Sequence, residues 1–393
     1  MTQIHRALAY STMAILLACG ISTPSASAGD HPGWPKFSWD RVPVCLHFGI
    51  TGRTMNSEEL KFVADTSNFI CLEKAHGMKT LGSTEKGIAH DAKRIKELNP
   101  DAKVLFYWNG ILNFSFYDVY EETRNNRNLV LRDKQGKPLL KGGKTGVEQF
   151  NIVDVNARKW WAAQAGRAVR DYHCDGVFMD ALPQVETRIP KQIGGGPKSK
   201  QQAISAAIDV MQRAKSEMGP DKILLFNGLR NLDRGNATYG KPFLEHADGA
   251  MFEHFTCFAS RTKESILKDI DWIVSAGKQG KLLVVKGWPE QDFNWMNKEK
   301  MRLPQEKLAE EAKEKITFSL ACFLVAAQEH SYFCYSWGYR ERGGTFVDYP
   351  EFKKPLGAPK GDYRKNGWTL TREFEHASVR VDLGKRKAKI DWR

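Results

Sequence analysis

The sequence lacks the short motifs that mark several enzyme classes. It has no Cys-x-x-Cys or His-Glu-x-x-His spacing, so zinc sites and thioredoxin-type redox sites are not indicated. No Gly-x-Ser-x-Gly turn is present, which argues against an α/β serine hydrolase. Residues 48–53 (FGITGR) do not match the Gly-x-Gly-x-x-Gly turn that binds dinucleotides. We therefore expect neither a metal nor a cofactor.

Long hydrophobic runs are also scarce, and we expect no transmembrane segment. The apolar run at residues 7–18 is too short to span a bilayer and predicts a secretory signal peptide. Ala26-Ser27-Ala28 is a cleavage site that would release a soluble chain from residue 29, leaving residues 1–28 as the signal. Alternatively, residues 16–19 (LLAC) resemble a lipobox that would place a lipid on Cys19. Either form is exported and would be periplasmic, secreted or lipid-anchored at a bacterial cell surface.

The composition is that of a globular protein with a basic surplus. The 393 residues include 59 Lys plus Arg and 46 Asp plus Glu, a net charge of +13, with 41% hydrophobic residues. These values exclude wholesale disorder. The positive charge is either a solvated surface or a preference for anionic glycans, and no nucleic-acid-binding signature is present. The 11 Trp, 11 Tyr and 21 Phe suit both a large core and a sugar-binding cleft.

Six cysteines remain outside the signal region, and most lie in apolar runs. A cysteine within a strand usually behaves as a small hydrophobic residue. We therefore expect mostly free buried thiols, while a Cys45–Cys71 disulfide on adjacent strands is left open because export permits disulfides.

Eight short apolar runs alternate with amphipathic stretches along the chain. Runs without polar alternation are typical of a parallel sheet that is covered on both faces. Eight such strands linked by helices predict an α/β fold, the (β/α)8 TIM barrel, and an open doubly wound sheet is the alternative. The expected strands are 42–49, 69–74, 103–109, 176–180, 223–227, 249–255, 282–286 and 332–337, and the expected helices are 57–64, 85–98, 156–172, 200–218, 262–276 and 304–328.

Two connections are long enough to be functional. Residues 113–150, after the third strand, are predicted to contain a hairpin around Gly136, and residues 228–248 follow the fifth strand. Both would lie at the carboxyl-terminal face, where TIM barrels keep their active sites. We assign residues 29–340 to the barrel and residues 341–393 to a small C-terminal β extension packed on it.

An Asp-Gly-x-x-x-acid pattern occurs twice. Residues 175–180 read DGVFMD and residues 248–253 read DGAMFE, on the fourth and sixth expected strands. Alternate barrel strands contribute to the same interior layer, so Asp180 and Glu253 are predicted to face one cavity. Two adjacent carboxyl groups are what glycosidic bond cleavage requires. The leading Asp175 and Asp248 would lie at the opposite end and stabilise the fold. For the pair Asp180 and Glu253, a structural or purely binding role is the alternative.

Polar and aromatic groups near the other strand ends suit sugar hydroxyls and ring faces. Each also has a structural interpretation, because a strand Trp is more often core than platform. Glu73 is a third candidate acid. The candidate substrate-binding residues are His47, Glu73, Trp108, Asn109, Asn227, His254, Lys286, Trp288 and Trp337.

Four segments resemble a known family. They are residues 174–182 (CDGVFMDAL), 223–229 (ILLFNGL), 248–255 (DGAMFEHF) and 348–361 (DYPEFKKPLGAPKG). In them the chain is similar to the hypothetical glycosyl hydrolase family 15 group of exported barrels. The resemblance implies a polysaccharide-active barrel with Asp180 as nucleophile or base and Glu253 as general acid.

We thus expect a glycoside hydrolase that cleaves an extracellular poly- or oligosaccharide, with an anionic glycan as one option, by a two-carboxylate mechanism. Retention and inversion of the anomeric configuration are both open. The alternatives are a glycan-binding barrel without catalysis and a polysaccharide lyase for uronic glycans, the latter suggested by Lys286 and the basic charge.

Overall fold

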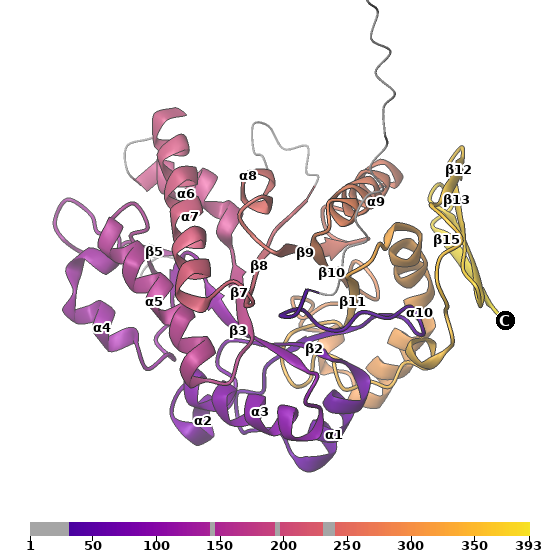
Figure 1. Ribbon diagram of the computed structural model, residues 1–393, viewed down its shortest axis with the longest axis horizontal. Helices are drawn as coiled ribbons and strands as arrows, with labels where there is room; N and C mark the ends of the chain where they lie inside the picture. The colour runs from indigo at the N-terminus through magenta and orange to yellow at the C-terminus, as the bar shows by residue number, and fades with distance from the viewer. Residues whose placement is uncertain (1–30, 142–145, 193–196, 231–239) are drawn as a thin grey trace, which may run out of the picture.

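Eight parallel strands form one sheet whose strand order follows the chain. The computed structural model describes residues 31–141, 146–192, 197–230 and 240–393, and Figure 1 shows their arrangement. Neighbouring strands pair in parallel throughout the sheet. The strands are β1 (Cys45–Phe48), β2 (Phe69–Leu72), β3 (Lys103–Asn109), β7 (Gly176–Asp180), β8 (Ile223–Asn227), β9 (Gly249–Phe255), β10 (Leu282–Gly287) and β11 (Ser331–Tyr335).

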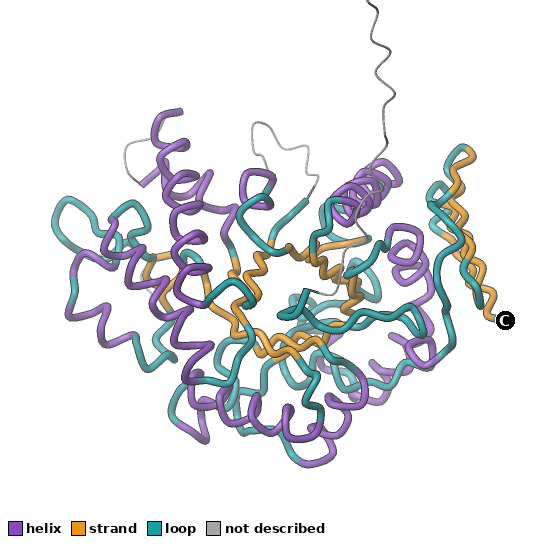
Figure 2. The backbone as a smooth tube through the Cα atoms, in the orientation of Figure 1, coloured by secondary structure: helices purple, strands orange, loops and turns teal. Residues whose placement is uncertain are grey.

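The sheet curls until its first and last strands meet. Val44, just before β1, forms a parallel bridge with Phe333 in β11, and the Phe333 N–H donates to the Pro43 carbonyl at 2.7 Å. Figure 2 shows the strands as a ring with the helices outside it. These contacts confirm the predicted (β/α)8 TIM barrel and exclude the open doubly wound sheet.

The helices between the strands begin where capping residues place them. The Asp154 carboxylate accepts from the Asn156 N–H at the start of the helix before β7. Asn56 and Glu59 form a reciprocal capping box on the first helix. The long helices are α1 (Ser57–Thr66), α3 (Thr84–Leu98), α5 (Val155–Asp171), α7 (Pro197–Met218), α9 (Lys263–Lys278) and α10 (Gln305–Ala326), and the short ones are α2 (Met78–Leu81), α4 (Tyr120–Asn125), α6 (Val185–Gln192) and α8 (Lys241–Leu244).

Alternation along each strand divides the core into two layers. One set of side chains fills the barrel interior, and the other packs between the strands and the helices. The interior layer is apolar at the amino-terminal end and becomes polar only where the strands end. Its buried members are Cys45, Phe69, Cys71, Leu105, Tyr107, Phe178, Ile223, Leu225, Met251, Leu282, Val284, Tyr332 and Cys334.

The glycines of the repeated Asp-Gly pattern are required by close approach of the neighbouring strand. A Cβ on Gly176 would lie 1.9 Å from the Ile223 carbonyl oxygen, and one on Gly249 would lie 1.7 Å from the Leu282 carbonyl oxygen. No side chain fits at such distances, because both obstacles are backbone. The pattern therefore reflects the same packing constraint at two places in the barrel.

The long connection after β3 contains the predicted hairpin. The Leu139 N–H donates to the Leu131 carbonyl at 2.8 Å, and Gly136 in the turn has φ +79°. The same connection also forms a three-stranded sheet of β4 (Leu112–Asn113), β6 (Val147–Gln149) and β5 (Leu140–Lys141). In the connection after β8, residues 231–239 lie outside the described residues.

The C-terminal residues form the predicted β appendage. Four antiparallel strands make a sheet that contacts α10, and Figure 1 shows it on the outside of the barrel. The buried Arg372 guanidinium donates to the Leu324 carbonyl at 3.0 Å and so ties the sheet to the end of α10. The strands are β12 (Arg364–Asn366), β13 (Thr369–Glu373), β14 (Ala377–Asp382) and β15 (Lys387–Trp392).

The cysteines are free and buried in the described residues, as expected. Cys45 and Cys71 lie on adjacent strands. In the register of these strands, however, Cys45 lies opposite Phe69 and Cys71 lies opposite His47. The predicted signal peptide and both of its processing sites, including Cys19, lie outside the described residues.

Candidate active site

A cavity of about 570 Å³ opens at the carboxyl-terminal ends of the barrel strands. Side chains from the ends of six strands meet there with residues of the loops after β10 and β11. This is the face at which TIM barrels place catalytic residues. The lining residues are His47, Glu73, Lys74, Tyr107, Phe178, Asp180, Asn227, Glu253, Trp295, Met301, Gln305, Trp337, Gly338, Tyr339, Arg340, Arg342 and Gly343.

Asp180, the last residue of β7, is held by three neutral donors. Its Oδ2 accepts from the Tyr107 hydroxyl and from Asn109 Nδ2 at 3.1 Å. Its Oδ1 accepts from Asn227 Nδ2 at 2.8 Å. All three donors belong to barrel strands, so the carboxylate is fixed by the most rigid part of the fold.

Glu253 in β9 faces the same cavity with a different set of partners. Its Oε1 accepts from the Tyr339 hydroxyl at 3.1 Å, and its Oε2 accepts from Arg230 Nη2 at 3.0 Å. Asn227 Nδ2 donates to Oε2 as well, at 3.1 Å. Two of these donors, Tyr339 and Arg230, lie on loops beyond the strand ends.

Asn227 joins the two acids through a single amide group. Its Nδ2 lies 2.8 Å from Asp180 Oδ1 and 3.1 Å from Glu253 Oε2. These two oxygens are therefore at most 2.8 + 3.1 = 5.9 Å apart. The structure thus brings the predicted acid pair together, and Asn227, a predicted substrate-binding residue, donates to both acids.

The two tyrosines beside the acids stay protonated. Burial and the nearby Asp180 carboxylate raise the pKa of Tyr107 well above its usual value. Burial and the Glu253 carboxylate do the same to the pKa of Tyr339. Each phenol is consequently a permanent hydrogen-bond donor to its carboxylate.

Glu73 lies on the same cavity wall but is already neutralised. Burial raises its pKa, yet Lys74 Nζ at 2.7 Å and His47 Nε2 at 3.4 Å outweigh burial and lower the pKa to about 2. Glu73 is therefore ionised at neutral pH and cannot supply a proton. It instead fixes Lys74 and His47, which line the cavity beside it.

Trp337 and Asn109 are the other predicted residues close to the acids. Trp337 lines the cavity directly. Asn109 is buried behind Asp180, to which it donates, and its Oδ1 accepts from the Ile111 and Leu112 N–H groups. Asn109 thus orients the acid from behind.

Besides Asn109, four predicted residues are not on the cavity wall. Trp108 points outward from β3, and its ring packs against Trp161 on α5 at a centroid distance of 6.0 Å. His254 adjoins a separate small pocket beside Arg230, and burial together with Arg230 lowers the pKa of His254 to about 3. Lys286 and Trp288 are buried behind the wall.

Lys286 and Trp288 form a support for β9. The Lys286 Nζ donates to the Ser336 carbonyl at 2.5 Å and lies 3.8 Å from the Trp288 ring centre. The indole N–H of Trp288 donates to the Glu253 carbonyl at 2.7 Å. Burial lowers the pKa of Lys286 to about 8.

Sequence reasoning missed several residues of the site, among them Tyr107, Arg230, Trp295 and Tyr339. Tyr107 could have been found, because it shares the inward face of its strand with Asn109. Arg230, Trp295 and Tyr339 lie on loops, where no periodic pattern predicts which side chains return to the barrel.

The opposite ends of β7 and β9 have the structural role predicted for them. Asp175 accepts from the Val104 N–H at 2.9 Å and pairs with Lys96 at 2.7 Å. Asp248 accepts from the Leu224 N–H at 2.7 Å and pairs with Lys215 at 2.6 Å. Both acids therefore pin adjacent strands together.

Two kinds of feature are absent from the described residues. No group of three or more His, Cys, Asp and Glu side chains that could hold a metal ion occurs there. Within the same residues no helix is long and apolar enough to cross a membrane.

The sequence profile of the family described as hypothetical glycosyl hydrolase family 15 matches residues 96–378, well over half of the chain. The chain belongs to this family. As a family 15 member it is a glycoside hydrolase, and both Asp180 and Glu253 lie within the matched region. A comparison with curated proteins gives no match.

Solved structures similar to this family 15 barrel include several carbohydrate-active enzymes. An α-amylase from Anoxybacillus has a TM-score of 0.51 and 13% identity, with 88% of each chain covered. A maltogenic α-amylase from Thermotoga neapolitana has a TM-score of 0.49 at 12% identity, covering 88% of this chain and 86% of that one. The glycoside hydrolase domain of PelA from Pseudomonas aeruginosa has a TM-score of 0.43 at 12% identity, covering 73% of this chain and 94% of that one. At such identities the first likeness supports the barrel fold alone.

Proposed function

We propose that the protein is a retaining glycoside hydrolase with Asp180 as nucleophile and Glu253 as general acid and base. The observation that supports this is the gap of at most 5.9 Å between their nearest oxygens. Retaining enzymes hold their carboxyl groups about 5–5.5 Å apart, whereas inverting enzymes need about 6.5–9.5 Å to admit a water.

The contacts of the two acids favour this division of roles. Tyr107 and Asn109 both donate to Oδ2 of Asp180, so Oδ1, which accepts from Asn227, is the oxygen presented toward Glu253. A carboxylate held by rigid strands suits a nucleophile. Glu253 must exchange a proton during the reaction. Its donors Arg230 and Tyr339 lie on loops beyond the strand ends, whereas all the donors to Asp180 lie on strands.

The reaction then runs in two balanced steps. Asp180 attacks the anomeric carbon, the glycosidic C–O bond breaks, and the leaving oxygen takes the proton of Glu253. Glu253, now ionised, removes a proton from water, which attacks the same carbon and releases Asp180. Each displacement inverts the carbon, so the product keeps the original anomeric configuration.

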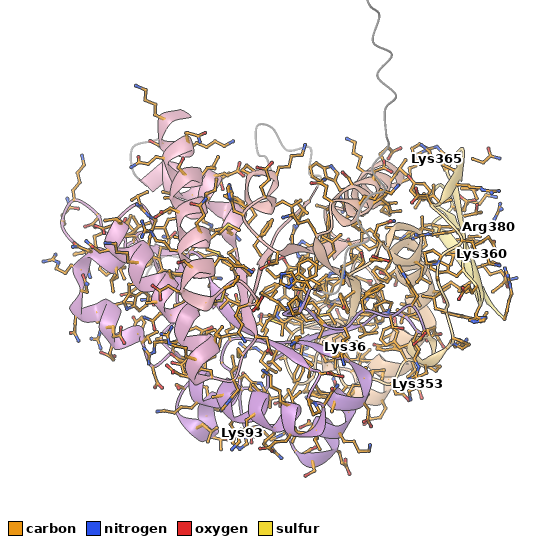
Figure 3. All side chains as sticks on the ribbon, in the orientation of Figure 1. Lys36, Lys93, Lys353, Lys360, Lys365 and Arg380 are labelled. Atoms are coloured by element: carbon orange, nitrogen blue, oxygen red, sulfur yellow. The ribbon has the colours of Figure 1, made fainter. Side chains whose placement is uncertain are left out.

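The substrate is proposed to be an external poly- or oligosaccharide. Lys74, Arg340 and Arg342 balance the three carboxylates of the cavity lining, so the cavity itself does not select for charge. The basic surplus lies elsewhere: residues 354–393 hold 11 Lys plus Arg and 5 Asp plus Glu, which is 11 − 5 = +6 of the total +13. Lys360, Lys365 and Arg380 project outward there (Figure 3), where they would attract an acidic glycan by long-range attraction. Export, predicted from residues 1–28, would bring the enzyme to such a substrate.

The product anomer tests the mechanism. The wild type is incubated with starch, a galactan, chitosan and polygalacturonate, and new reducing ends are measured. The first anomer released is then identified by proton NMR before mutarotation. We expect reducing ends from at least one polymer and retention of configuration. Inversion would overturn the nucleophile role of Asp180, and binding without new reducing ends would favour a glycan-binding protein.

A lyase with Lys286 as base is not supported. A lyase base must reach a sugar proton, but Lys286 is fully buried and its amine already donates to the carbonyls of Ser336 and Gly287. Ultraviolet absorbance of an unsaturated uronate from polygalacturonate would reverse this conclusion.

A further inference from the structure

Trp295 exposes an aromatic surface at the cavity mouth. Its side chain is 44% exposed, and the adjacent Met296 is 58% exposed. Trp295 also lines the cavity that holds the two acids. Few large apolar side chains of the described residues are as exposed as these, and the other exposed Trp, Trp368, lies on the distant C-terminal sheet. Exposed aromatic area at a cavity rim is typical of a binding surface.

The ring of Trp295 is held in one orientation. Its backbone N–H donates to the Trp337 carbonyl at 3.0 Å. Its ring lies 5.1 Å from that of Trp288 with a tilt of 38°. The Met296 N–H donates to Asn294 Oδ1 at 2.9 Å and fixes the following turn. A platform already held in place loses little conformational entropy when a ligand stacks on it.

The platform is on the Glu253 side of the cavity. Trp288, which supports Trp295, is hydrogen-bonded to the Glu253 carbonyl. Tyr339 also connects Trp295 to Glu253. Its ring centre lies 6.0 Å from that of Trp295, and its hydroxyl donates to the Glu253 carboxylate. No such contact joins Trp295 to Asp180 in the described residues.

We propose that Trp295 is the stacking platform for the sugar that leaves in the first step. The inference rests on the proposed function, in which Glu253 protonates the leaving oxygen. That oxygen must lie beside Glu253, so the sugar attached to it lies on the side of the cavity where Trp295 is exposed. The ligand class is a pyranose whose apolar ring face covers the indole. The enzyme would therefore favour leaving groups that are themselves sugars.

Two substrates with different leaving groups test the platform. One is an oligosaccharide of the polymer that the wild type cleaves best, and the other is the glycosyl fluoride of the same sugar, whose fluoride has no ring to stack. For Trp295→Ala we expect kcat/KM on the oligosaccharide to fall about 10- to 100-fold, the effect of losing one buried aromatic contact. Turnover of the fluoride should stay within about twofold of the wild type.

Three further variants separate stacking from packing. Trp295→Phe keeps a flat ring and should recover most of the oligosaccharide activity, whereas Trp295→Leu keeps apolar volume without a ring face and should not. Trp368→Ala removes the exposed Trp of the C-terminal sheet and should leave both substrates unchanged. Equal losses on both substrates for Trp295→Ala, or full activity of Trp295→Leu, would overturn the proposal.

Failure of the proposed function has a different signature. In that case the wild type would release no reducing ends from any of the four polymers. If the wild type does hydrolyse the oligosaccharide and Trp295→Ala matches it on both substrates, only the platform is refuted.

Discussion

The two ends of strands β7 and β9 use the same residue types for opposite purposes. At the amino-terminal ends, Asp175 and Asp248 each bind a backbone N–H of the preceding strand and a lysine. At the carboxyl-terminal ends, Asp180 and Glu253 face an open cavity and share the amide of Asn227. The first pair closes the wall of the barrel, and the second pair leaves lone pairs for a substrate.

The difference shows that partners, not residue type, assign a role to a carboxylate. A lysine and a buried N–H satisfy an acid and make it part of the fold. Of the two cavity acids, Asp180 has only neutral donors, among them Tyr107 and Asn227, which orient it without cancelling its charge. Substitutions at the two ends should therefore separate catalysis from stability.

The largest expected effect is on activity at Asp180. Asp180→Asn keeps the size of the side chain and removes the nucleophile, so hydrolysis should fall by roughly 10⁴-fold or more. The matched control is Asp175→Asn on the same strand, which should keep near wild-type turnover. Reducing-end release measures the activity of both variants. Comparable losses of activity would contradict separate roles for the two ends of the strand.

Glu253→Gln should give the next largest loss, and one that depends on the leaving group. Without a general acid, hydrolysis of a sugar-linked substrate should fall about 10²- to 10⁴-fold. A glycosyl fluoride needs no proton, so formation of the covalent intermediate from it should persist. Measuring kcat/KM on both substrates checks this; equal losses on both would assign Glu253 a role other than acid.

A smaller effect is expected at Tyr107. Tyr107→Phe removes one donor from Asp180 Oδ2 and leaves Asn109 in place. A hydrogen bond to a charged group contributes about 1.5–3 kcal/mol, so kcat should fall about 10- to 100-fold with little change in KM. An unchanged kcat would mean that Tyr107 does not hold the nucleophile.

The amino-terminal acids should affect stability instead. Asp248→Ala leaves the Leu224 N–H without its acceptor and removes the ion pair of Lys215, which we expect to lower the free energy of unfolding by about 1–3 kcal/mol. Urea unfolding measures the loss, and turnover of the folded enzyme should be unchanged. A catalytic defect at full stability would contradict the structural role.

The lysines sharpen the same comparison through pH. Lys215 pairs with Asp248, whereas the acceptors of the buried Lys286 are backbone carbonyls. The pKa of Lys286 is about 8 in the folded chain, against an ordinary value near 10.5. Between these values the unfolded chain binds more protons, so this group makes stability rise with pH from about 8 upward. The difference in unfolding free energy between wild type and Lys286→Met should change across this window by roughly 2–3 kcal/mol. A constant difference would contradict the shift.

Much of the fold follows from the sequence, because the spacing of apolar residues and the capping of helices are local properties. The runs 103–109, 176–180, 223–227 and 249–255 match strands residue for residue. The convergence of Asp180 and Glu253 followed from alternation in a closed sheet. Trp108 was predicted to bind substrate because it lies near a strand end. The alternation of side chains along β3 instead points it outward, toward the helices. Trp295 and Tyr339 depend on the path of loops, which only tertiary packing determines.

The layer of cysteines beneath the cavity has a practical consequence. Cys45, Cys71 and Cys334 are all buried inside the barrel, and burial raises the pKa of each thiol. In the intact ring such sulfurs are shielded from alkylating dyes. Their labelling rate would therefore measure how often neighbouring strands separate. No engineered cysteine is needed for this measurement.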